Sequence, residues 1–390
     1  MGKVIKKTFK IFKDMDKVLL FTTLILIIFG SLNIVTASSR EAVVNADANI
    51  FYYFFKHIII LTISLISFLF VINIPTKNYK KWLVLIYIVV ACMNAYLILK
   101  GVSTRGANNW INLKFIKIQP SELAKPTLIL AMGLLLKKHE KALKDPNQKH
   151  DLAIWTIIGT SLLFPILVFL QKDLGTAIIL FGIFAVMFIF SPILTKEKIK
   201  ASVISVVVII IMLVVRLSIT GYVLSGAQNS RLSNFFNPCS KYENTGYQVC
   251  NAFIAINNGG LFGVGLGKST QKYSYIPEPH TDMVFAIIAE ENGLIACAII
   301  FILYLVILYR ILMLSKKTKD ISNKYICIGV ATYIFLHIFI NLGGLFGIIP
   351  LTGVPLPFLS YGGSFTLSLI TTLGVVQRIH IEMKNEKIKI

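Results

Sequence analysis

The feature that most constrains this chain is a series of apolar runs, each about as long as a membrane-crossing helix. A helix crosses the hydrocarbon core in roughly 20 apolar residues, and no water there can satisfy an unpaired backbone. The runs lie near 18–37, 51–73, 82–99, 121–137, 152–170, 174–191, 201–221, 282–313, 325–349 and 358–380. We therefore expect an all-α, polytopic membrane protein with about ten transmembrane helices.

The composition excludes several other classes of protein. Hydrophobic residues make up 56% of the chain and charged residues only 15%, whereas soluble domains carry about 25% charged residues. The 27 Phe residues and the positive mean hydropathy argue against intrinsic disorder. The net charge of +21 would suggest a nucleic-acid partner in a soluble protein, but in a membrane protein it reports orientation.

Orientation follows from the lysines and arginines, which are retained on the cytoplasmic side of a membrane. The amino-terminal segment carries Lys3, Lys6, Lys7, Lys10, Lys13 and Lys17. Placing this end inside and alternating the spans puts most of the 39 cations inside and both termini in the cytoplasm. The exceptions, in the outer loop before the fourth span, are Lys100, Arg105, Lys114 and Lys117. We interpret these exceptions as a sign of an anionic ligand, and we expect no nucleic acid.

The spans define the domain organisation. We expect a basic cytoplasmic tail at 1–17, one transmembrane domain at 18–380 and a cytoplasmic tail at 381–390. The longest polar segment, 221–281, is predicted to be an extracellular loop, and ordered loops of that length are usually functional.

Two of the five cysteines, Cys239 and Cys250, lie in this loop. A disulfide between them is plausible on an oxidising face, and two free thiols are the alternative. The remaining cysteines, Cys92, Cys297 and Cys327, fall within spans and are predicted to be packing residues.

Charged residues within or beside spans are candidates for function, because burying a charge in a membrane is costly. Glu122 and Lys125 are three residues apart at the start of the fourth span, which puts them on one helix face where they can pair. Ser121 is a candidate helix cap. Asp173, between spans five and six, is either a partner for Lys125 or an ordinary N-cap.

The segment IPEPHTDMVFA, residues 276–286, lies at the outer mouth of the eighth span. Its prolines stiffen the approach, and Thr281 or Asp282 is expected to begin the helix. Asp282 is therefore either a helix cap or a catalytic group. Glu290 and Glu291 follow two turns later and require either a buried network or an aqueous cavity.

Two further segments are interpreted as architectural. Residues 258–267 are rich in glycine, but they lack the strand and helix context of a nucleotide-binding loop, so close backbone packing is expected. In residues 350–364, Pro and Gly interrupt the apolar pattern between the last two spans. Irregular backbone at membrane depth must be shielded from lipid, which predicts a re-entrant or cavity-lining segment.

These segments together resemble the SEDS family (shape, elongation, division and sporulation), which includes RodA and FtsW. The motifs occur in the family's order: RGANNWI from residue 105, QPSELAK from 119, QKDLGTA from 171, PEPHTD from 277 and LTGVPLPFLSYGG from 351. The resemblance extends from the first span to about residue 380, and the last two motifs are closer to the FtsW branch.

The resemblance implies a peptidoglycan glycosyltransferase that polymerises lipid II at the outer face of the bacterial cytoplasmic membrane, in division or elongation. It gives Asp282 the role of general base, and it makes Glu122, Lys125 and Asp173 substrate-binding or cavity-forming residues. Arg105 and Lys125, with Lys172 or Lys268, are candidates to stabilise the undecaprenyl diphosphate leaving group. The sequence identifies no definite cofactor, although a divalent cation, Mg²⁺ or Mn²⁺, could aid these side chains.

The chain departs from the family pattern at three positions. Asn109 stands where members often have Arg, which puts an anion contact at this position in doubt. Pro279 replaces the usual Ala, and Phe365 stands where a second Ser is common. None of these changes affects the proposed base.

Two other functions are compatible with the same sequence features. Ten helices with interrupted spans and intramembrane charges also describe a lipid II flippase, and a noncatalytic scaffold that recruits a cell-wall synthase is the second alternative. The resemblance implies a partner as well, a class B penicillin-binding protein that supplies the transpeptidase.

Overall fold

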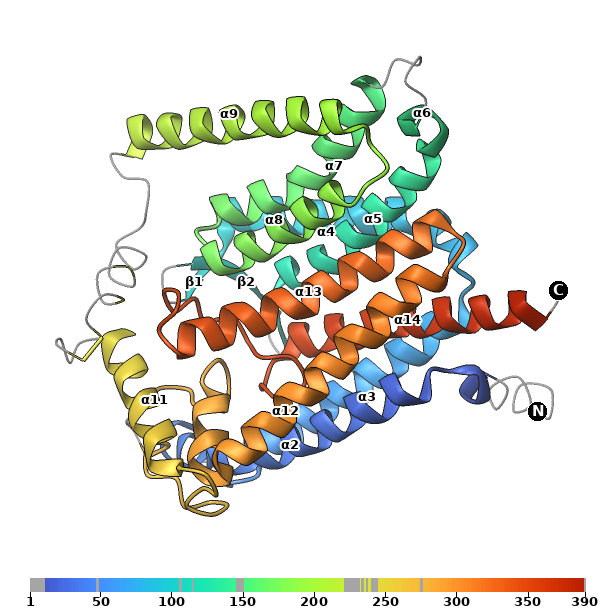
Figure 1. The fold of residues 1–390 in the computed structure, drawn as a ribbon. Coiled ribbons are helices and arrows are strands. Elements are labelled where there is room, and N and C mark those ends of the chain that lie inside the picture. The colour runs from blue at the N-terminus through green and yellow to red at the C-terminus, as the bar shows by residue number, and fades with distance from the viewer. Residues whose placement is uncertain are drawn as a thin grey trace.

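The computed structural model describes residues 11–46, 49–104, 107–113, 116–144, 151–220, 232, 235, 238–239, 245–273 and 276–388. Each of the ten apolar runs forms a helix (Figure 1). These helices are α2 (Lys17–Ala46), α3 (Tyr52–Asn73), α4 (Tyr79–Lys100), α5 (Pro120–Lys138), α7 (Asp151–Leu170), α8 (Leu174–Ile189), α9 (Thr195–Thr220), α12 (Val284–Lys317), α13 (Ile321–Leu345) and α14 (Gly363–Ile388). Helix α14 thus continues through most of the predicted tail at 381–390.

Within the described residues, six helical stretches are long and apolar enough to cross a membrane. They are Lys17–Val44, Tyr52–Asn73, Thr76–Lys100, Asp151–Leu170, Val284–Lys317 and Ile321–Leu345. The third includes the short 3₁₀ helix η1 (Thr76–Asn78). These six stretches confirm that the chain is a membrane protein. The total of ten membrane crossings stays a prediction.

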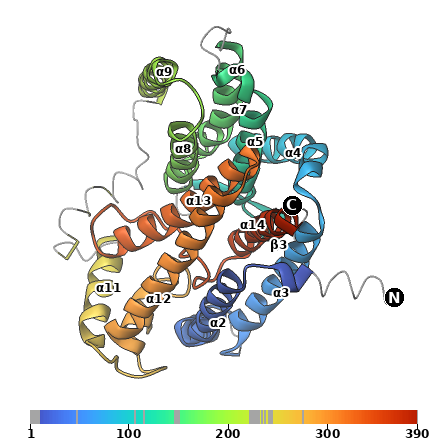
Figure 2. The ribbon, with the colours of Figure 1, turned by 45° about the vertical axis from the view of Figure 1, so that its right-hand side comes forward.

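Helix α13 lies at the centre of the bundle, between α5 and α8 on one side and α12 on the other (Figures 1 and 2). Small residues allow this packing. A Cβ atom at Gly329 would lie 2.7 Å from Met187 Sδ of α8 and 2.8 Å from a side-chain carbon of Ile129 of α5. Helix α9 lies at the margin of the molecule in both views.

A small antiparallel sheet joins α4 to α5, so the prediction of an all-α fold was wrong for this segment. Its strands are β1 (Val102–Thr104), β2 (Ala107–Leu113) and β3 (Ile116–Ile118), in the order β1-β2-β3. Two of the three strands have only three residues, which is too short for alternation of polar and apolar side chains to reveal a strand.

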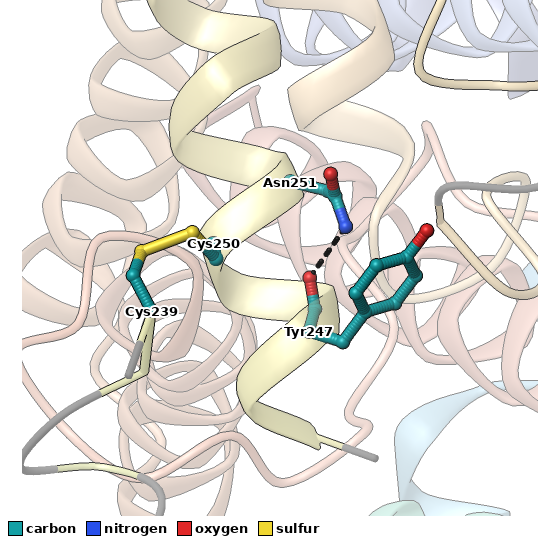
Figure 3. Close-up of a disulfide and its surroundings, with 4 residues drawn as sticks. All are labelled: Cys239, Tyr247, Cys250 and Asn251. Carbon is teal, nitrogen blue, oxygen red and sulfur yellow. Dashed lines mark hydrogen bonds between the residues drawn. A yellow bond between two sulfur atoms is a disulfide. The ribbon is translucent and has the colours of Figure 1, made fainter. Parts of the chain in front are cut away.

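The long polar segment 221–281 is not simply a loop, because it contains helix α11 (Thr245–Gly259). This helix packs against α12. A disulfide joins Cys250 of α11 to Cys239, with their Cα atoms 5.2 Å apart, and Figure 3 shows the bond on one side of α11. The bond ties the chain before α11 to the helix.

Glycines bring the segment after α11 into backbone contact with α12, as predicted for residues 258–267. A Cβ atom at Gly259 would lie 2.0 Å from the carbonyl oxygen of Ala289, and one at Gly263 would lie 2.3 Å from that of Glu291. Helix α12 itself breaks at Gly293, where φ is 76° and ψ is 178°. Glycine adopts such angles readily because it lacks a Cβ atom.

Candidate active site

A cavity of about 430 Å³, lined by several charged side chains, lies among the helices. Its wall is built by α2, α3, β2, β3, α5, α8 and α13, by the chain before α12 and by the chain before α14. The charged side chains that line it are Glu41, Lys117, Glu122, Lys125, Lys172, Asp173, Glu278 and Asp282. Four of the five predicted site residues outside the cysteines, namely Glu122, Lys125, Asp173 and Asp282, therefore share one cavity. The fifth, Arg105, lies outside the described residues.

The predicted pair of Glu122 and Lys125 is present on α5. Lys125 Nζ lies 2.7 Å from Glu122 Oε1, and the two residues are 0% and 2% exposed. Removing both charges from water is costly, and their short contact offsets part of that cost. Ser121 does not cap the helix: α5 begins at Pro120, its N-cap is Gln119, and the Ser121 hydroxyl is buried without a hydrogen bond.

Lys125 has a second partner, which was not among the predicted site residues. Its Nζ lies 2.9 Å from Nε2 of His337, which is fully buried on α13 and also lines the cavity. The Nδ1 atom of the same ring lies 3.1 Å from the carbonyl oxygen of Pro355. The sequence alone could have identified His337 as a candidate, because it is an ionisable residue inside an apolar run.

Asp173 is the N-cap of α8, which was one of the two predicted alternatives, and among the described side chains the salt bridge of Lys125 is with Glu122 and not with Asp173. Its Oδ1 accepts a hydrogen bond from the backbone N–H of Thr176 at 3.1 Å. Its Oδ2 accepts hydrogen bonds from Asn109 Nδ2 at 2.7 Å and from Gln119 Nε2 at 3.2 Å. Asp173 thus joins the sheet to α8 at the wall of the cavity.

Asp282 lies just before α12 and does not cap it, because that helix begins at Val284 with Met283 as its N-cap. The expectation that Thr281 or Asp282 begins the helix was therefore wrong. The backbone oxygen of Asp282 accepts a hydrogen bond from Asn341 Nδ2 at 2.7 Å, and its Oδ1 accepts one from Thr281 Oγ1 at 3.0 Å. The residue is 4% exposed and lines the cavity.

A second carboxylate, Glu41, lies near the segment before α12 and was not among the predicted site residues. Glu41 Oε2 of α2 lies 3.3 Å from Nδ1 of His280, and both residues line the cavity. The His280 ring contacts the rings of Tyr53 and Tyr361, with centroids 4.4 and 5.3 Å away. Glu41 follows an apolar run without an evident motif, so only the fold reveals its position.

Glu290 and Glu291 form the buried network that was one of the two predicted alternatives. Glu290 accepts hydrogen bonds from Ser269 and from the backbone N–H of Thr270, and Lys272 Nζ lies 3.0 Å from Glu291 Oε1. Neither glutamate lines the cavity described above. The network instead holds the segment after α11 against α12.

The lysines of the cavity differ in accessibility. Lys117 of β3 is exposed and Lys172 is half-buried, whereas Lys125 is fully buried and paired. Lys268, another candidate, does not line this cavity. Of the described residues, no group of three or more His, Cys, Asp or Glu side chains is arranged to hold a metal ion. The cavity therefore brings several carboxylates, among them Asp282, together with Lys117 and Lys172.

The chain belongs to the family described as "Cell cycle protein", which takes in FtsW, RodA and SpoVE and matches residues 16–385. Stage V sporulation protein E of Bacillus subtilis is 28% identical over 93% of this chain and 96% of its own length. A probable peptidoglycan glycosyltransferase FtsW of Marinomonas mediterranea is 34% identical over 95% and 90%. Peptidoglycan glycosyltransferase MrdB of Escherichia coli is 29% identical over 97% of both chains. Several other relatives carry the name FtsW, which confirms the predicted resemblance.

Solved structures show the same fold. A chain from a study of the structural coordination of polymerization and crosslinking by a peptidoglycan synthase complex matches with a TM-score of 0.71 and 21% identity, covering 95% of this chain and 98% of that one. The rod shape determining protein RodA of Thermus thermophilus matches with a TM-score of 0.63 and 23% identity, covering 94% and 96%.

Proposed function

We propose that this protein is a peptidoglycan glycosyltransferase that polymerises lipid II at the outer face of the cytoplasmic membrane. The observation that carries the proposal is Asp282, a carboxylate held off the helix in a cavity that also presents Lys117 and Lys172. Relatives named as peptidoglycan glycosyltransferases align over nearly the whole chain, which supports the same reaction here.

The reaction needs one base and one cationic region. A sugar hydroxyl of the acceptor attacks the anomeric carbon of the donor, and Asp282 accepts the hydroxyl proton as the new C–O bond forms. The bond from the anomeric carbon to the diphosphate breaks, and its electron pair leaves with undecaprenyl diphosphate. A single displacement of this kind inverts the anomeric centre and needs no second carboxylate.

Lys117 and Lys172 are the side chains that we assign to the diphosphate. Their positive charge opposes the negative charge that develops on the leaving group. Lys125 also lines the cavity, but its contacts with Glu122 and His337 fit it for holding the wall in place. Arg105 remains a predicted contact of the diphosphate.

The position of the cavity agrees with chemistry at the outer face. Asp16 directly precedes α2 and Glu41 lies near its other end. The 25 steps along the chain from 16 to 41 correspond to about 37 Å at 1.5 Å per residue of helix. Arg310 Nη2 lies 2.7 Å from Asp16 Oδ2, and Lys384 Nζ lies 2.8 Å from Asp14 Oδ1. The segment before α2 thus contacts α12 and α14 about a bilayer thickness from the Glu41 wall of the cavity, which fits two cytoplasmic termini.

A partner that crosslinks the glycan strands completes the proposal. The chain with the highest structural similarity quoted above comes from a complex that couples polymerization to crosslinking. We expect a class B penicillin-binding protein to be the crosslinking partner of this chain.

The decisive experiment is lipid II polymerisation by the purified protein in detergent, with and without its partner. Glycan strands should form, because detergent leaves no two sides to cross. A protein that moves lipid II across vesicles but makes no strands would be a flippase, and one that does neither would be a scaffold.

A further inference from the structure

His337 of α13 lies between the Glu122–Lys125 pair and the chain segment that adjoins Asp282. It is fully buried, and each ring nitrogen has one partner: Nε2 lies 2.9 Å from Lys125 Nζ, and Nδ1 lies 3.1 Å from the carbonyl oxygen of Pro355. The reaction described above gives this residue no role.

The two partners determine the protonation of the His337 ring. A carbonyl oxygen can only accept a hydrogen bond, so Nδ1 carries a hydrogen and donates it to Pro355. A lysine ammonium group can only donate, so Nε2 accepts from Lys125. His337 is therefore a neutral imidazole of fixed tautomer, with both nitrogens engaged by protein groups.

One helical turn further along α13, Asn341 makes a parallel set of contacts. Its Nδ2 donates to the carbonyl oxygens of Asp282, at 2.7 Å, and of Val354, at 2.8 Å. Residues four apart share a helix face, so His337 and Asn341 together hold two consecutive carbonyl groups, those of Val354 and Pro355.

The segment held in this way lies directly against the proposed base. A Cβ atom at Gly353 would lie 3.5 Å from Asp282 Oδ2, so a small movement of this segment would change the space around the carboxylate. Gly353 has a φ of 77°, a value that an L side chain rarely adopts. Both observations indicate that the backbone at 353–355 has to be placed accurately.

The remaining neighbours of His337 pack against its ring. Phe365 is stacked on it, with ring centroids 4.6 Å apart and planes at 19°, and Tyr333 meets it edge-on at 5.0 Å. Glu122 is linked to the ring through Lys125, whose Nζ contacts both residues. An aromatic replacement can therefore keep the packing while removing both hydrogen bonds.

We propose that His337 is a positioning residue for glycosyl transfer, which links Lys125 to Pro355 and thereby holds residues 353–355 against Asp282. The proposal rests on the proposed function for its effect on catalysis. Its structural part, the ordering of residues 353–355 by His337, stands apart from the reaction.

Two substitutions separate the hydrogen bonds from the packing. His337→Gln retains one acceptor for Lys125 and one donor for Pro355, whereas His337→Phe retains the stacking on Phe365 but neither hydrogen bond. We expect the Gln variant to stay within about threefold of the wild type in kcat on lipid II. The Phe variant should lose roughly 10- to 100-fold in kcat, with KM changed less, because misplaced catalytic groups slow the chemical step.

The pH profile distinguishes positioning from proton transfer. The kcat of the Gln variant should follow the same pH dependence as that of the wild type, since His337 does not exchange protons with substrate. Loss of an ionisation from the profile of the Gln variant would overturn the proposal, as would a folded Gln variant as inactive as the Phe variant, or a fully active Phe variant.

Amide hydrogen exchange tests the structural part without activity. In detergent, the peptide covering 351–357 should exchange faster in the Phe variant than in the wild type, and the Gln variant should match the wild type. Unchanged exchange in the Phe variant would refute the proposal. If the Phe variant cannot be purified, His337→Leu takes its place. A wild type that polymerises nothing would refute the proposed function alone, because the exchange result still decides whether His337 orders the segment.

Discussion

At Asp282, different parts of the molecule hold the backbone and the side chain. Asn341 of α13 binds the backbone oxygen, while Thr281 donates to Oδ1 of the carboxylate. Thr281 Oγ1 also lies 2.8 Å from the carbonyl oxygen of Glu278, in the same turn. A base held in this way needs little rearrangement when substrate arrives, which is the benefit of preorganisation.

Replacement of Asp282 is the most direct test of its role. We expect Asp282→Ala and Asp282→Asn to insert and fold but to lose about 10²- to 10⁴-fold in kcat, the usual contribution of a general base. The Asn variant keeps the size and most hydrogen bonding of the side chain, so it serves as the control for structure. Polymerisation of purified lipid II at the wild-type rate by either variant would exclude Asp282 as the base.

The two accessible lysines of the cavity should matter for the leaving group. We expect Lys117→Ala and Lys172→Ala each to lower kcat/KM for lipid II by roughly 10- to 100-fold, because a hydrogen bond to a charged group typically contributes about 1.5–3 kcal/mol. Lys100→Ala removes the same charge from the end of α4, outside the cavity, and should have little effect. Equal losses in all three variants would indicate a general effect of net charge.

At the scale of elements, the contact between the segment after α11 and α12 depends on backbone geometry. The backbone N–H groups of Val264 and Gly265 donate to the carbonyl oxygens of Glu290 and Glu291, at 2.9 and 3.0 Å. The same two glutamates bind the segment through their side chains. This double attachment places the break at Gly293 and hence the direction of α12.

Two glycine substitutions test this attachment. Gly263 and Gly267 have similar φ values, 79° and 76°, but only at Gly263 would a Cβ atom meet backbone, 2.3 Å from the Glu291 oxygen. Backbone strain alone costs on the order of 1–3 kcal/mol. We expect Gly263→Ala to lower the thermal unfolding temperature in detergent clearly more than Gly267→Ala does. Equal shifts would mean that strain, and not the close approach, limits both positions.

The sheet between α4 and α5 explains one departure from the family pattern. Asn109 of β2 donates its side-chain N–H to Asp173, so it fastens the sheet to the N-terminus of α8. The position that often holds Arg in the family thus serves here as a neutral hydrogen-bond donor. The lysines at 117 and 172, which line the same cavity, supply cations nearby.

At the scale of the whole molecule, the residue before α2 is fastened to α14 and α12. Gln377 Oε1 of α14 accepts from the backbone N–H of Asp16, and its Nε2 donates to the Asp16 carbonyl oxygen. Arg310 of α12 pairs with the carboxylate of the same residue. The start of α2 and the C-terminal parts of α12 and α14 therefore meet at one end of the helix bundle.

Membrane orientation can be measured from this arrangement. We expect a fluorescent protein that matures only in the cytoplasm to be bright when fused after residue 390, and alkaline phosphatase at the same position to be inactive. The matched fusion within 221–244 should give the opposite result. An active phosphatase at the C-terminus would contradict the predicted cytoplasmic termini and the assignment of the cavity to the outer face.

The apolar runs by themselves determined the helices, because a chain without water around its backbone has few alternatives to the helix. The spacing of Glu122 and Lys125 likewise predicted their pair, since residues three apart are neighbours on any helix. Motifs from distant parts of the chain were identified, but nothing in their spacing showed that they share one cavity.

Only the tertiary structure decided which groups meet across the bundle. Glu41 and His280 are far apart in sequence, as are Lys125 and His337, and each pair depends on how helices pack. The caps assigned to Ser121 and Thr281 or Asp282 were wrong for a related reason, since contacts between elements determine where α5 and α12 begin. Local pattern specifies a helix, whereas the environment of its charged residues is set by neighbours that the local sequence does not contain.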